Sequence, residues 1–351
     1  MIWAEQAARI LLGARSLLIM SHIFPDGDSI GSLLALGLAL ARRSREVTLV
    51  CPDDIPETYA FLPGIEGILT VEGARERLSA GRNVDLVVIL DSSDLERIGK
   101  GANLIPEDAC VVNIDHHVTN KNFGAHNFIK VEAAAVGELV YALLLALGTD
   151  IDKDIATCLL TALIADTGSF RYSNTTAETF DIAARLVKRG AEPAVIAEHV
   201  FETKPFSSLK LLGRVLDNLE LSPDGRVAWV SLPHRLLDEF HVNEAQTEGF
   251  VNYARMVAGV EVAVLFREEA NSRIRVGLRS RDRFDVSRLA QRFGGGGHAK
   301  AAGCTIEGDL EHAKQLVLEA IADELGNEPR NNGNETGGIH AEEAEGRVRG
   351  R

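Results

Sequence analysis

The first half of the chain alternates short apolar runs with longer segments of helical periodicity. The apolar runs have the length of buried strands and are Leu17–Met20, Val47–Val50, Leu86–Leu90 and Val111–Ile114. The helical patterns are rich in leucine and small residues and are Ser29–Ala41, Gly137–Leu147 and Ile155–Ala165. This alternation is typical of a parallel sheet with both faces covered by helices. We therefore predict an α/β domain with a doubly wound parallel sheet over residues 1–195.

Acidic and histidine side chains follow these apolar runs at four places along the chain. They are His22 with Asp26 and Asp28, then Asp91, then Asp115 with His116 and His117, and finally Asp166. In an open parallel sheet, the carboxyl ends of the strands share one edge. We therefore expect the side chains that follow Met20, Leu90 and Ile114 to converge in a crevice at that edge.

So many carboxylates in one crevice would repel one another unless cations neutralised them. Oxygen ligands with a minority of imidazole nitrogens favour manganese or magnesium over a thiolate-bound zinc. Helix capping is the alternative explanation for any single residue, with Asp28 or Ser29 as the cap of Ile30–Ala41. Capping does not explain the four places together, because Asp115 precedes two histidines and Asp166 follows a helical pattern.

The combination of His22, Asp26 and Asp28 with the three later places resembles the four successive motifs of the DHH phosphoesterases. That resemblance implies two metal ions, each with its own ligand set. One ion would be held by His22, Asp26 and Asp91, and the other by Asp28, Asp91, His116 and Asp166. Asp91 would bridge the two. We expect two Mn²⁺ ions, with Mg²⁺ as the alternative.

The resemblance also implies that His117 faces the substrate phosphate. We expect Asp115 to accept a hydrogen bond that orients a ligand imidazole. Two cations close together would activate water and clamp the phosphoryl oxygens during in-line attack, without a covalent intermediate. The predicted catalytic residues are thus Asp91, Asp115 and His117. One departure from the family is Ala134–Ala135, where many relatives carry a hydroxyl residue before a Gly-Glu pair, and it removes one minor hydrogen bond.

A second, smaller mixed α/β domain is predicted for residues 216–325, after a linker at 196–215. Its strand patterns are Val227–Leu232, Val260–Phe266 and Arg273–Leu278, and its helical patterns include Ser208–Leu219, Val286–Phe293 and Leu310–Leu325. Residues 326–351 are rich in Asn, Gly and Glu and have almost no large apolar side chains. Such a segment cannot offset the entropy of ordering, so we predict a disordered tail.

A glycine run, Gly294–Gly297, precedes His298 in this second domain. Backbone amides without side chains can approach a phosphate closely. Between Arg267 and Lys300, eight arginines and one lysine stand against four acidic residues, which indicates a phosphate-binding face. The region resembles the DHH-associated substrate-binding domain of bacterial nanoRNases. The resemblance implies that Gly295, Gly296 and His298 hold the nucleotide, and we add Arg279 as a phosphate contact.

The overall charge and composition narrow the partners further. A formal net charge of -14 argues against broad binding to duplex nucleic acid, so any nucleic-acid partner should be short and locally held. No uncharged apolar segment has the length of a membrane span, and the four cysteines lack the paired spacing of a zinc site. We therefore expect a cytoplasmic protein with reduced thiols and no membrane partner.

The predicted function is hydrolysis of short single-stranded RNA or DNA oligonucleotides and small phosphorylated nucleotides, with 3′-phosphoadenosine 5′-phosphate among them. One alternative is a phosphodiesterase for the linear dinucleotides pApA or pGpG of cyclic dinucleotide signalling. Another is a non-catalytic nucleotide sensor built on the same fold. A family pyrophosphatase and a long-strand DNA exonuclease fit the sequence less well. The sequence leaves the oligomeric state open, a homodimer included.

Overall fold

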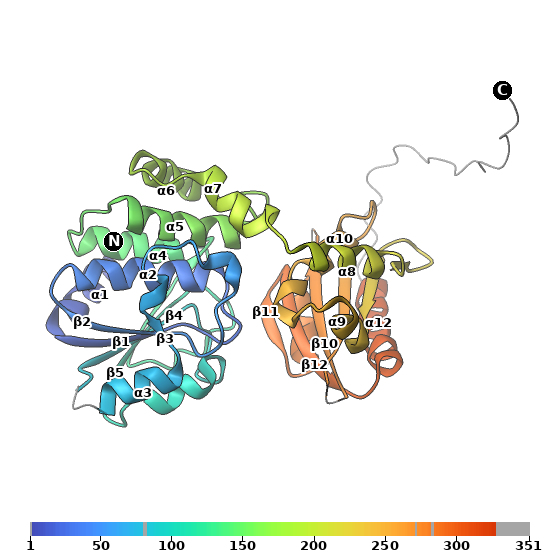
Figure 1. The fold of residues 1–351 in the computed structure, drawn as a ribbon, viewed down its shortest axis with the longest axis horizontal. Coiled ribbons are helices and arrows are strands. Elements are labelled where there is room, and N and C mark those ends of the chain that lie inside the picture. Colours follow the sequence, from blue (N-terminus) through green and yellow to red (C-terminus); the bar gives the residue numbers. More distant parts are fainter. Residues whose placement is uncertain (1, 80–82, 271, 282–283, 328–351) are drawn as a thin grey trace, which may run out of the picture.

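The first lobe is built on a six-stranded parallel sheet, seen at the left of Figure 1. The structure is a computed structural model that describes residues 2–79, 83–270, 272–281 and 284–327. The strands of the first sheet are β1 (Ser16–Met20), β2 (Glu46–Val50), β3 (Ile68–Leu69), β4 (Leu86–Leu90), β5 (Cys110–Asp115) and β6 (His126–Ile129). Their order is β3-β2-β1-β4-β5-β6, and every neighbouring pair is parallel. The predicted doubly wound parallel sheet is confirmed.

Helices cover both faces of this sheet, although not in the predicted way. One face carries α1 (Ile2–Gly13), α2 (Gly27–Ala41), α4 (Val136–Ala146), α5 (Lys153–Asp166) and α6 (Ala177–Lys188). The other carries α3 (Val71–Ser79) and a 3₁₀ segment, η3 (Glu96–Leu104). Strand residues alternate between the two layers, so Leu17 and Ile19 face the first and Leu18 and Met20 the second. The three helices that the sequence predicted therefore share one face.

Helices α2 and α5 approach each other closely because glycine and alanine stand at their contact. A Cβ atom at Gly31 would lie 2.4 Å from the carbonyl oxygen of Cys158, and one at Gly137 would lie 2.7 Å from the Cβ of Ala162. Small side chains let the backbones of α2, α4 and α5 meet around one point. This packing fixes the start of α2 and the end of α5, which carry Asp28 and Asp166.

The strand order reverses between β1 and β4, which are neighbours in the sheet. From β1 the chain proceeds outward to β2 and β3, and from β4 it proceeds the other way to β5 and β6. Such a switch point opens a crevice at the carboxyl ends of the two central strands. His22 follows β1 and Asp91 follows β4, so the fold brings both to this crevice.

The second lobe has a six-stranded mixed sheet of order β11-β12-β10-β9-β8-β7. Its strands are β7 (Glu220–Leu221), β8 (Val227–Leu232), β9 (Val262–Glu268), β10 (Arg273–Ser280), β11 (Gly296–His298) and β12 (Ala301–Glu307). Only the β8–β9 pairing is parallel. One face packs on α8 (Phe206–Leu216), α9 (His234–Phe240) and α10 (Phe250–Arg255), and the other on α11 (Val286–Arg292) and α12 (Leu310–Asn327). The smaller mixed α/β domain is thus confirmed as a fold class.

The two cores are joined by helical turns as well as by loop. The chain passes through α7 (Pro193–Ala197) and a π-helical turn, η4 (Glu198–Glu202), before α8 begins. Ile196 and Val200 belong to the first core, and Leu211 and Val215 to the second, so the exchange of cores falls inside residues 196–215. The remaining 3₁₀ turns are η1 (Glu57–Tyr59), η2 (Ile65–Gly67) and η5 (Glu244–Thr247).

The predicted tail, 326–351, lies outside the described residues except for its first two positions, which end α12. Within the described part of the chain, every helix is too short or too polar to cross a membrane.

Candidate metal centre

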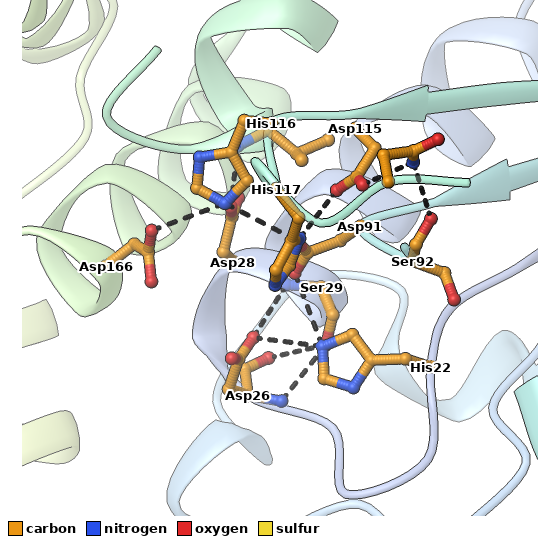
Figure 2. Close-up of polar contacts among 12 residues, drawn as sticks. His22, Asp26, Asp28, Ser29, Asp91, Ser92, Asp115, His116, His117 and Asp166 are labelled. Carbon is orange, nitrogen blue, oxygen red and sulfur yellow. Dashed lines mark hydrogen bonds and ion pairs between the residues drawn. The ribbon is translucent and has the colours of Figure 1, made fainter. Parts of the chain in front are cut away.

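The acidic and histidine residues singled out by the sequence meet at the crevice between β1 and β4. Figure 2 shows His22, Asp26, Asp28, Asp91, His116, His117 and Asp166 pointing toward a common centre. They come from the loop after β1, the start of α2, the ends of β4 and β5, and the last turn of α5. Four segments far apart in the sequence therefore supply one cluster.

Two carboxylates at the start of α2 also serve as helix caps. Asp26 is the N-cap residue of α2, with a reciprocal capping box to Ser29. Asp28 accepts hydrogen bonds from the backbone N–H groups of Val136 and Gly137, at 2.6 and 2.9 Å, and so caps α4. The sequence analysis gave Asp28 or Ser29 as the alternative cap of α2, whereas the N-cap residue is Asp26 and Ser29 contributes to its capping box. Capping and metal binding are compatible, because a carboxylate has lone pairs for both.

The N-cap position of α4 lacks the hydroxyl residue that the family resemblance leads us to expect. Ala135 is the N-cap residue and makes no side-chain capping bond. The carboxylate of Asp28 reaches the same backbone N–H groups from a neighbouring helix. A carboxylate at a helix N-terminus is also favoured by the helix dipole.

Asp91 lies between two groups of candidate ligands. Its Oδ2 is 3.3 Å from Nε2 of His22, and its Oδ1 is 3.6 Å from Nε2 of His116. Its backbone φ is 57°, a left-handed conformation that aspartate tolerates better than most residues. The left-handed backbone at this position turns the carboxylate into the crevice. A residue with an ordinary φ would continue along the line of the strand.

The first group consists of His22, Asp26 and Asp91, whose ligand atoms lie within 4.8 Å of one another. The second consists of Asp28, His116 and Asp166, whose ligand atoms also lie within 4.8 Å of one another. Nε2 of His116 is 3.6 Å from Oδ2 of Asp166 and 3.9 Å from Oδ2 of Asp28. Asp91 belongs to the first group and also approaches His116 of the second.

Both candidate ligand histidines are held by their Nδ1 atoms. Nδ1 of His22 is 2.6 Å from the carbonyl oxygen of Ile23, and Nδ1 of His116 is 3.0 Å from that of Ala133. A backbone carbonyl accepts only from a protonated nitrogen, so Nδ1 carries a proton in each ring and Nε2 is the nitrogen that faces the crevice. Once Nε2 has lost its own proton, each ring can bind a metal through it.

The chemistry of the donor atoms fits a pair of divalent cations. Oδ1 of Asp91 and Nε2 of His116 are buried and have no hydrogen-bond partner in the protein. Buried polar atoms without a partner are costly, and a cation would satisfy both. Cysteine plays no part, since Cys51, Cys110, Cys158 and Cys304 belong to none of the candidate ligand groups in the described residues.

The pKa values of Asp166 and His116 are shifted by burial and by the charges of neighbouring cluster residues. Burial raises the pKa of Asp166 to about 7, although the charge of His116 opposes this. Burial lowers the pKa of His116, but the carboxylates of Asp166, Asp91 and Asp28 raise it to about 10. Without cations, the cluster would therefore hold protons in their place. Bound cations would displace these protons.

Asp115 lies behind the cluster and orients one histidine. Its Oδ1 is 2.7 Å from Nδ1 of His117, and its Oδ2 accepts from Nδ2 of Asn120 at 2.6 Å. Asn120 in turn donates to Oδ1 of Asn113, which is anchored to the carbonyl oxygen of Ile89. The histidine that Asp115 contacts is His117, for which we predicted a phosphate role, and not His116. Asn113 and Asn120 carried no motif that could have found them.

His298 of the second lobe reaches the cluster directly. Its ring stacks on that of His117, with centroids 4.2 Å apart, and meets His116 edge-on at 5.0 Å. Burial and the nearby charges of His117 and His116 lower the pKa of His298 well below its ordinary value. His298 is therefore neutral near pH 7 and faces the candidate metal centre.

The glycines of the run Gly294–Gly297 differ in the space around them and in backbone conformation. A Cβ at Gly295 would lie 2.1 Å from the carbonyl oxygen of Gly303, whereas one at Gly296 would meet nothing within 4 Å. Gly297 has φ of 138°, which L side chains rarely adopt. Gly295 and Gly297 are thus required by the backbone of β11. Gly296 leaves open space above the sheet.

Two arginines, Arg279 and Arg97, differ in their electrostatic neighbours. Arg279 lies apart from the histidines, and its electrostatic neighbours are Tyr172, Glu248 and Arg255. Arg97, which the sequence analysis did not identify, acts by its charge on both His22 and His298. Its Nε is buried without a hydrogen-bond partner. The charge of Arg97 thus acts on residues of both lobes at the cluster.

Comparisons with known proteins extend over both lobes. Residues 16–163 match the model of the DHH family, N-terminal domain, and residues 226–327 match that of the DHHA1 domain. The chain is similar to the bifunctional oligoribonuclease and PAP phosphatase NrnA of Thermus thermophilus, with 35% identity over 88% of this chain and 89% of the relative. The Bacillus subtilis protein of the same name is 27% identical over 83% of this chain and 89% of its own length.

Among solved structures, the chain is similar to an exopolyphosphatase-related protein from Bacteroides fragilis. The TM-score is 0.85, with 29% sequence identity, and the match covers 92% of this chain and 96% of that one. The likeness thus includes both lobes.

Proposed function

Because the chain belongs to the DHH family of phosphoesterases, we propose that it is a two-metal hydrolase that degrades short oligoribonucleotides to mononucleotides and dephosphorylates 3′-phosphoadenosine 5′-phosphate. One observation carries this proposal. Two groups of ligand atoms lie side by side, because Asp91 of the first is 3.6 Å from His116 of the second, and within the described residues they contain buried atoms without hydrogen-bond partners and are faced by His298 of the second lobe. The names of the relatives from Thermus thermophilus and Bacillus subtilis support the choice of substrates.

His22, Asp26 and Asp91 would hold one ion, and Asp28, Asp91, His116 and Asp166 the other. We propose Mn²⁺ as the preferred metal, because imidazole nitrogen in the ligand set favours it over Mg²⁺. When bound, such a pair supplies Lewis-acid activation of water and of the phosphoryl group.

The chain's own residues would bind and orient the phosphate. Asp115 keeps the Nδ1 of His117 engaged, so the Nε2 of this ring is free to contact a phosphoryl oxygen. His298 and Arg97 lie on the same cluster and would contribute further donors. Contact between the lobes at His117 and His298 would also exclude water around the reacting phosphate. Gly295, Gly296 and Arg279 are proposed to hold the rest of the nucleotide.

The proposal is tested first by removing the metals. Protein treated with chelator should lose hydrolysis of the dinucleotide pApA and of 3′-phosphoadenosine 5′-phosphate, and Mn²⁺ should restore it better than Mg²⁺ or Zn²⁺. Metal content measured alongside turnover links the two. Full activity in protein without metal would refute the mechanism.

A substrate panel separates the proposed function from its alternatives. We expect specificity constants within about 10-fold for dinucleotides of different sequence, because base stacking and backbone contacts tolerate every base. A strong preference for pApA or pGpG alone would favour the signalling phosphodiesterase instead. Nucleotide binding without turnover, at full metal occupancy, would favour the sensor.

A further inference from the structure

Phe24 is an exposed aromatic residue held in a strained conformation beside the metal centre. It lies between His22 and Asp26, its side chain is 58% exposed, and its backbone φ is 56°. Its backbone N–H donates to Oδ2 of Asp53 at 2.8 Å, which fixes this conformation. A left-handed backbone is unfavourable for a non-glycine residue, and such strain is concentrated at functional sites. Neither burial nor core packing accounts for the position of this ring.

The ring is contacted across the lobes by Arg275 of β10. The guanidinium carbon of Arg275 lies 3.8 Å from the centroid of the Phe24 ring. Among the described residues, no hydrogen bond or ion pair of this guanidinium is found, whereas Arg267 pairs with Glu244 and Arg273 with Glu269. Burial lowers the pKa of Arg275, and the charge of Arg267 acts in the same direction. Arg275 thus brings to the ring a positive charge that makes no ion pair among the described residues, although the charges of Glu269, Glu244 and Asp53 act on it.

The face of the second sheet next to Arg275 has a floor without side chains. Gly277 is two residues from Arg275 on β10 and therefore on the same face. It pairs with Gly303 of β12, and Gly303 pairs with Gly296 of β11. A Cβ at Gly296 would meet nothing within 4 Å, one at Gly277 would make an ordinary contact at 3.8 Å, and one at Gly303 would lie 3.0 Å from the carbonyl oxygen of Val276. We call these three residues the glycine floor.

On the sheet, the glycine floor lies between Arg275 and a row of paired residues that ends with His298 at the candidate metal centre. On the far side of the floor, Ala301 pairs with His298, whose ring stacks on His117. A flat surface of backbone bordered by an aromatic ring, a cation and a catalytic phosphate site matches the shape of a nucleoside, whose planar base adjoins a phosphorylated sugar. Aliphatic or peptide ligands would make no use of an exposed ring face beside an unpaired arginine.

We propose that Phe24, Arg275 and the glycine floor form a subsite for a base next to the scissile phosphate, with Phe24 as its stacking residue. The proposal rests on the proposed function for its substrate class. Stacking on an aromatic ring is worth about 5- to 150-fold in binding per base and tolerates every base, because each has a π-face. Phe24 is therefore a binding residue for the base and takes no part in bond cleavage.

The test is a double-mutant cycle between Phe24 and the base. Specificity constants are measured with Mn²⁺ for pApA and for two analogues, each lacking one base, on wild type and Phe24→Ala. We expect Phe24→Ala to lower kcat/KM for pApA by about 10- to 100-fold, mainly through KM. For one of the abasic analogues, the same substitution should change kcat/KM by less than about 2-fold. Equal losses on all three substrates would overturn the proposal.

Three further variants separate stacking from packing. Phe24→Leu keeps an apolar side chain against Arg275 but has no π-face, and it should behave like Phe24→Ala. Phe24→Trp should restore most of the loss. Phe180→Ala removes a phenyl ring of similar exposure, 55%, from α6 and should leave all specificity constants unchanged. Full activity of Phe24→Leu on pApA would show that the ring only packs, and would refute the stacking role.

The outcome is distinguishable from failure of the proposed function. Wild type that binds metal but hydrolyses none of the three substrates would refute the proposed function. In that case the same cycle is measured on dissociation constants for pApA and its analogues by calorimetry. Coupling between Phe24 and one base would then support the subsite, and its absence would overturn it.

Discussion

Asp91 differs from its neighbours in the cluster because its removal would affect both ligand groups at once. Burial works against its ionisation, but the hydrogen bond and charge of His22, followed by the charges of His117 and His116, hold the pKa of Asp91 below its ordinary value. It is therefore ionised at neutral pH. Asp115 is also buried and ionised, yet its bonds go to His117 and Asn120.

Replacing these two aspartates should thus have different consequences. Asp91→Ala should abolish turnover and lower metal content, because it removes a ligand from both groups. Asp115→Ala should leave metal content close to wild type and lower kcat by about 10- to 100-fold, because His117 loses the partner that orients it. Elemental analysis and steady-state kinetics on both variants check this division. Near wild-type turnover in Asp91→Ala would disprove its bridging role.

At the scale of residues, the sequence predicts those site residues whose place follows from the neighbouring strand pattern. The metal ligands stand directly after apolar runs, so strand-end geometry predicts their convergence. Asn120 and Arg97 lie in segments without a periodic pattern, and their roles depend on side chains that only the fold brings near. The αL conformations of Phe24 and Asp91 are likewise absent from the pattern, since tertiary contacts hold both against their local preference.

Among the elements, α2 has the tightest packing requirement, because it positions Asp26 and Asp28 through its contact with α5. We expect Gly31→Ala to destabilise the protein by about 1–3 kcal/mol, since a Cβ there would lie 2.4 Å from the carbonyl oxygen of Cys158. Gly213→Ala is the matched control: it lies in α8, and a Cβ there would meet nothing within 4 Å. That change should stabilise by up to about 1 kcal/mol through helix propensity.

Urea unfolding measures the stability of both variants. When the dependence of the unfolding free energy on urea concentration is unchanged, a shift of the midpoint reports a change in stability. Equal midpoints for the two glycine variants would contradict the close-packing account of α2 and α5.

Three of the elements that the sequence analysis did not predict share a physical cause. Strand β3 has only two residues, and β6 is a half-buried edge strand that contains His126 and Asn127. Helix α3 is largely polar and buries only Val71 and Ala74. Such elements are determined by the sheet they complete and have little pattern of their own. The central strands and α2, α4 and α5 are buried on most sides, so their apolar runs were sufficient.

At the scale of the whole molecule, side chains of the two lobes meet beside the candidate metal centre. The stacking of His298 on His117 and of Arg275 on Phe24 joins residues more than 100 positions apart, and no local pattern predicts such contacts. From its arginines and glycine run, the sequence favours phosphate binding by the second lobe, and this stays a prediction. It could not predict that His298 would reach the metal centre itself.

This arrangement predicts a preference for short substrates. A dinucleotide can place one phosphate at the metals and a base on the second lobe, and so convert the binding energy of both lobes into turnover. Further nucleotides would extend into the surroundings of a chain whose net charge is -14, where they are repelled. We expect kcat/KM to be highest for about two to five nucleotides and to fall for longer RNA.

His298 and Gly296 test the contribution of the second lobe to this preference. His298→Ala should reduce hydrolysis of dinucleotides while the metals stay bound, because none of the proposed ligands changes. Gly296→Leu should do the same without loss of stability, since its side chain would enter the open space above the glycine floor. Gly295→Leu is the contrasting variant, because a Cβ there would collide with the carbonyl oxygen of Gly303 at 2.1 Å and should destabilise the fold. Specificity constants for RNA of increasing length, measured on wild type and these variants, decide the point. If wild type cleaved dinucleotides and long strands equally well, or if His298→Ala matched wild type, the second lobe would have no part in selecting the substrate.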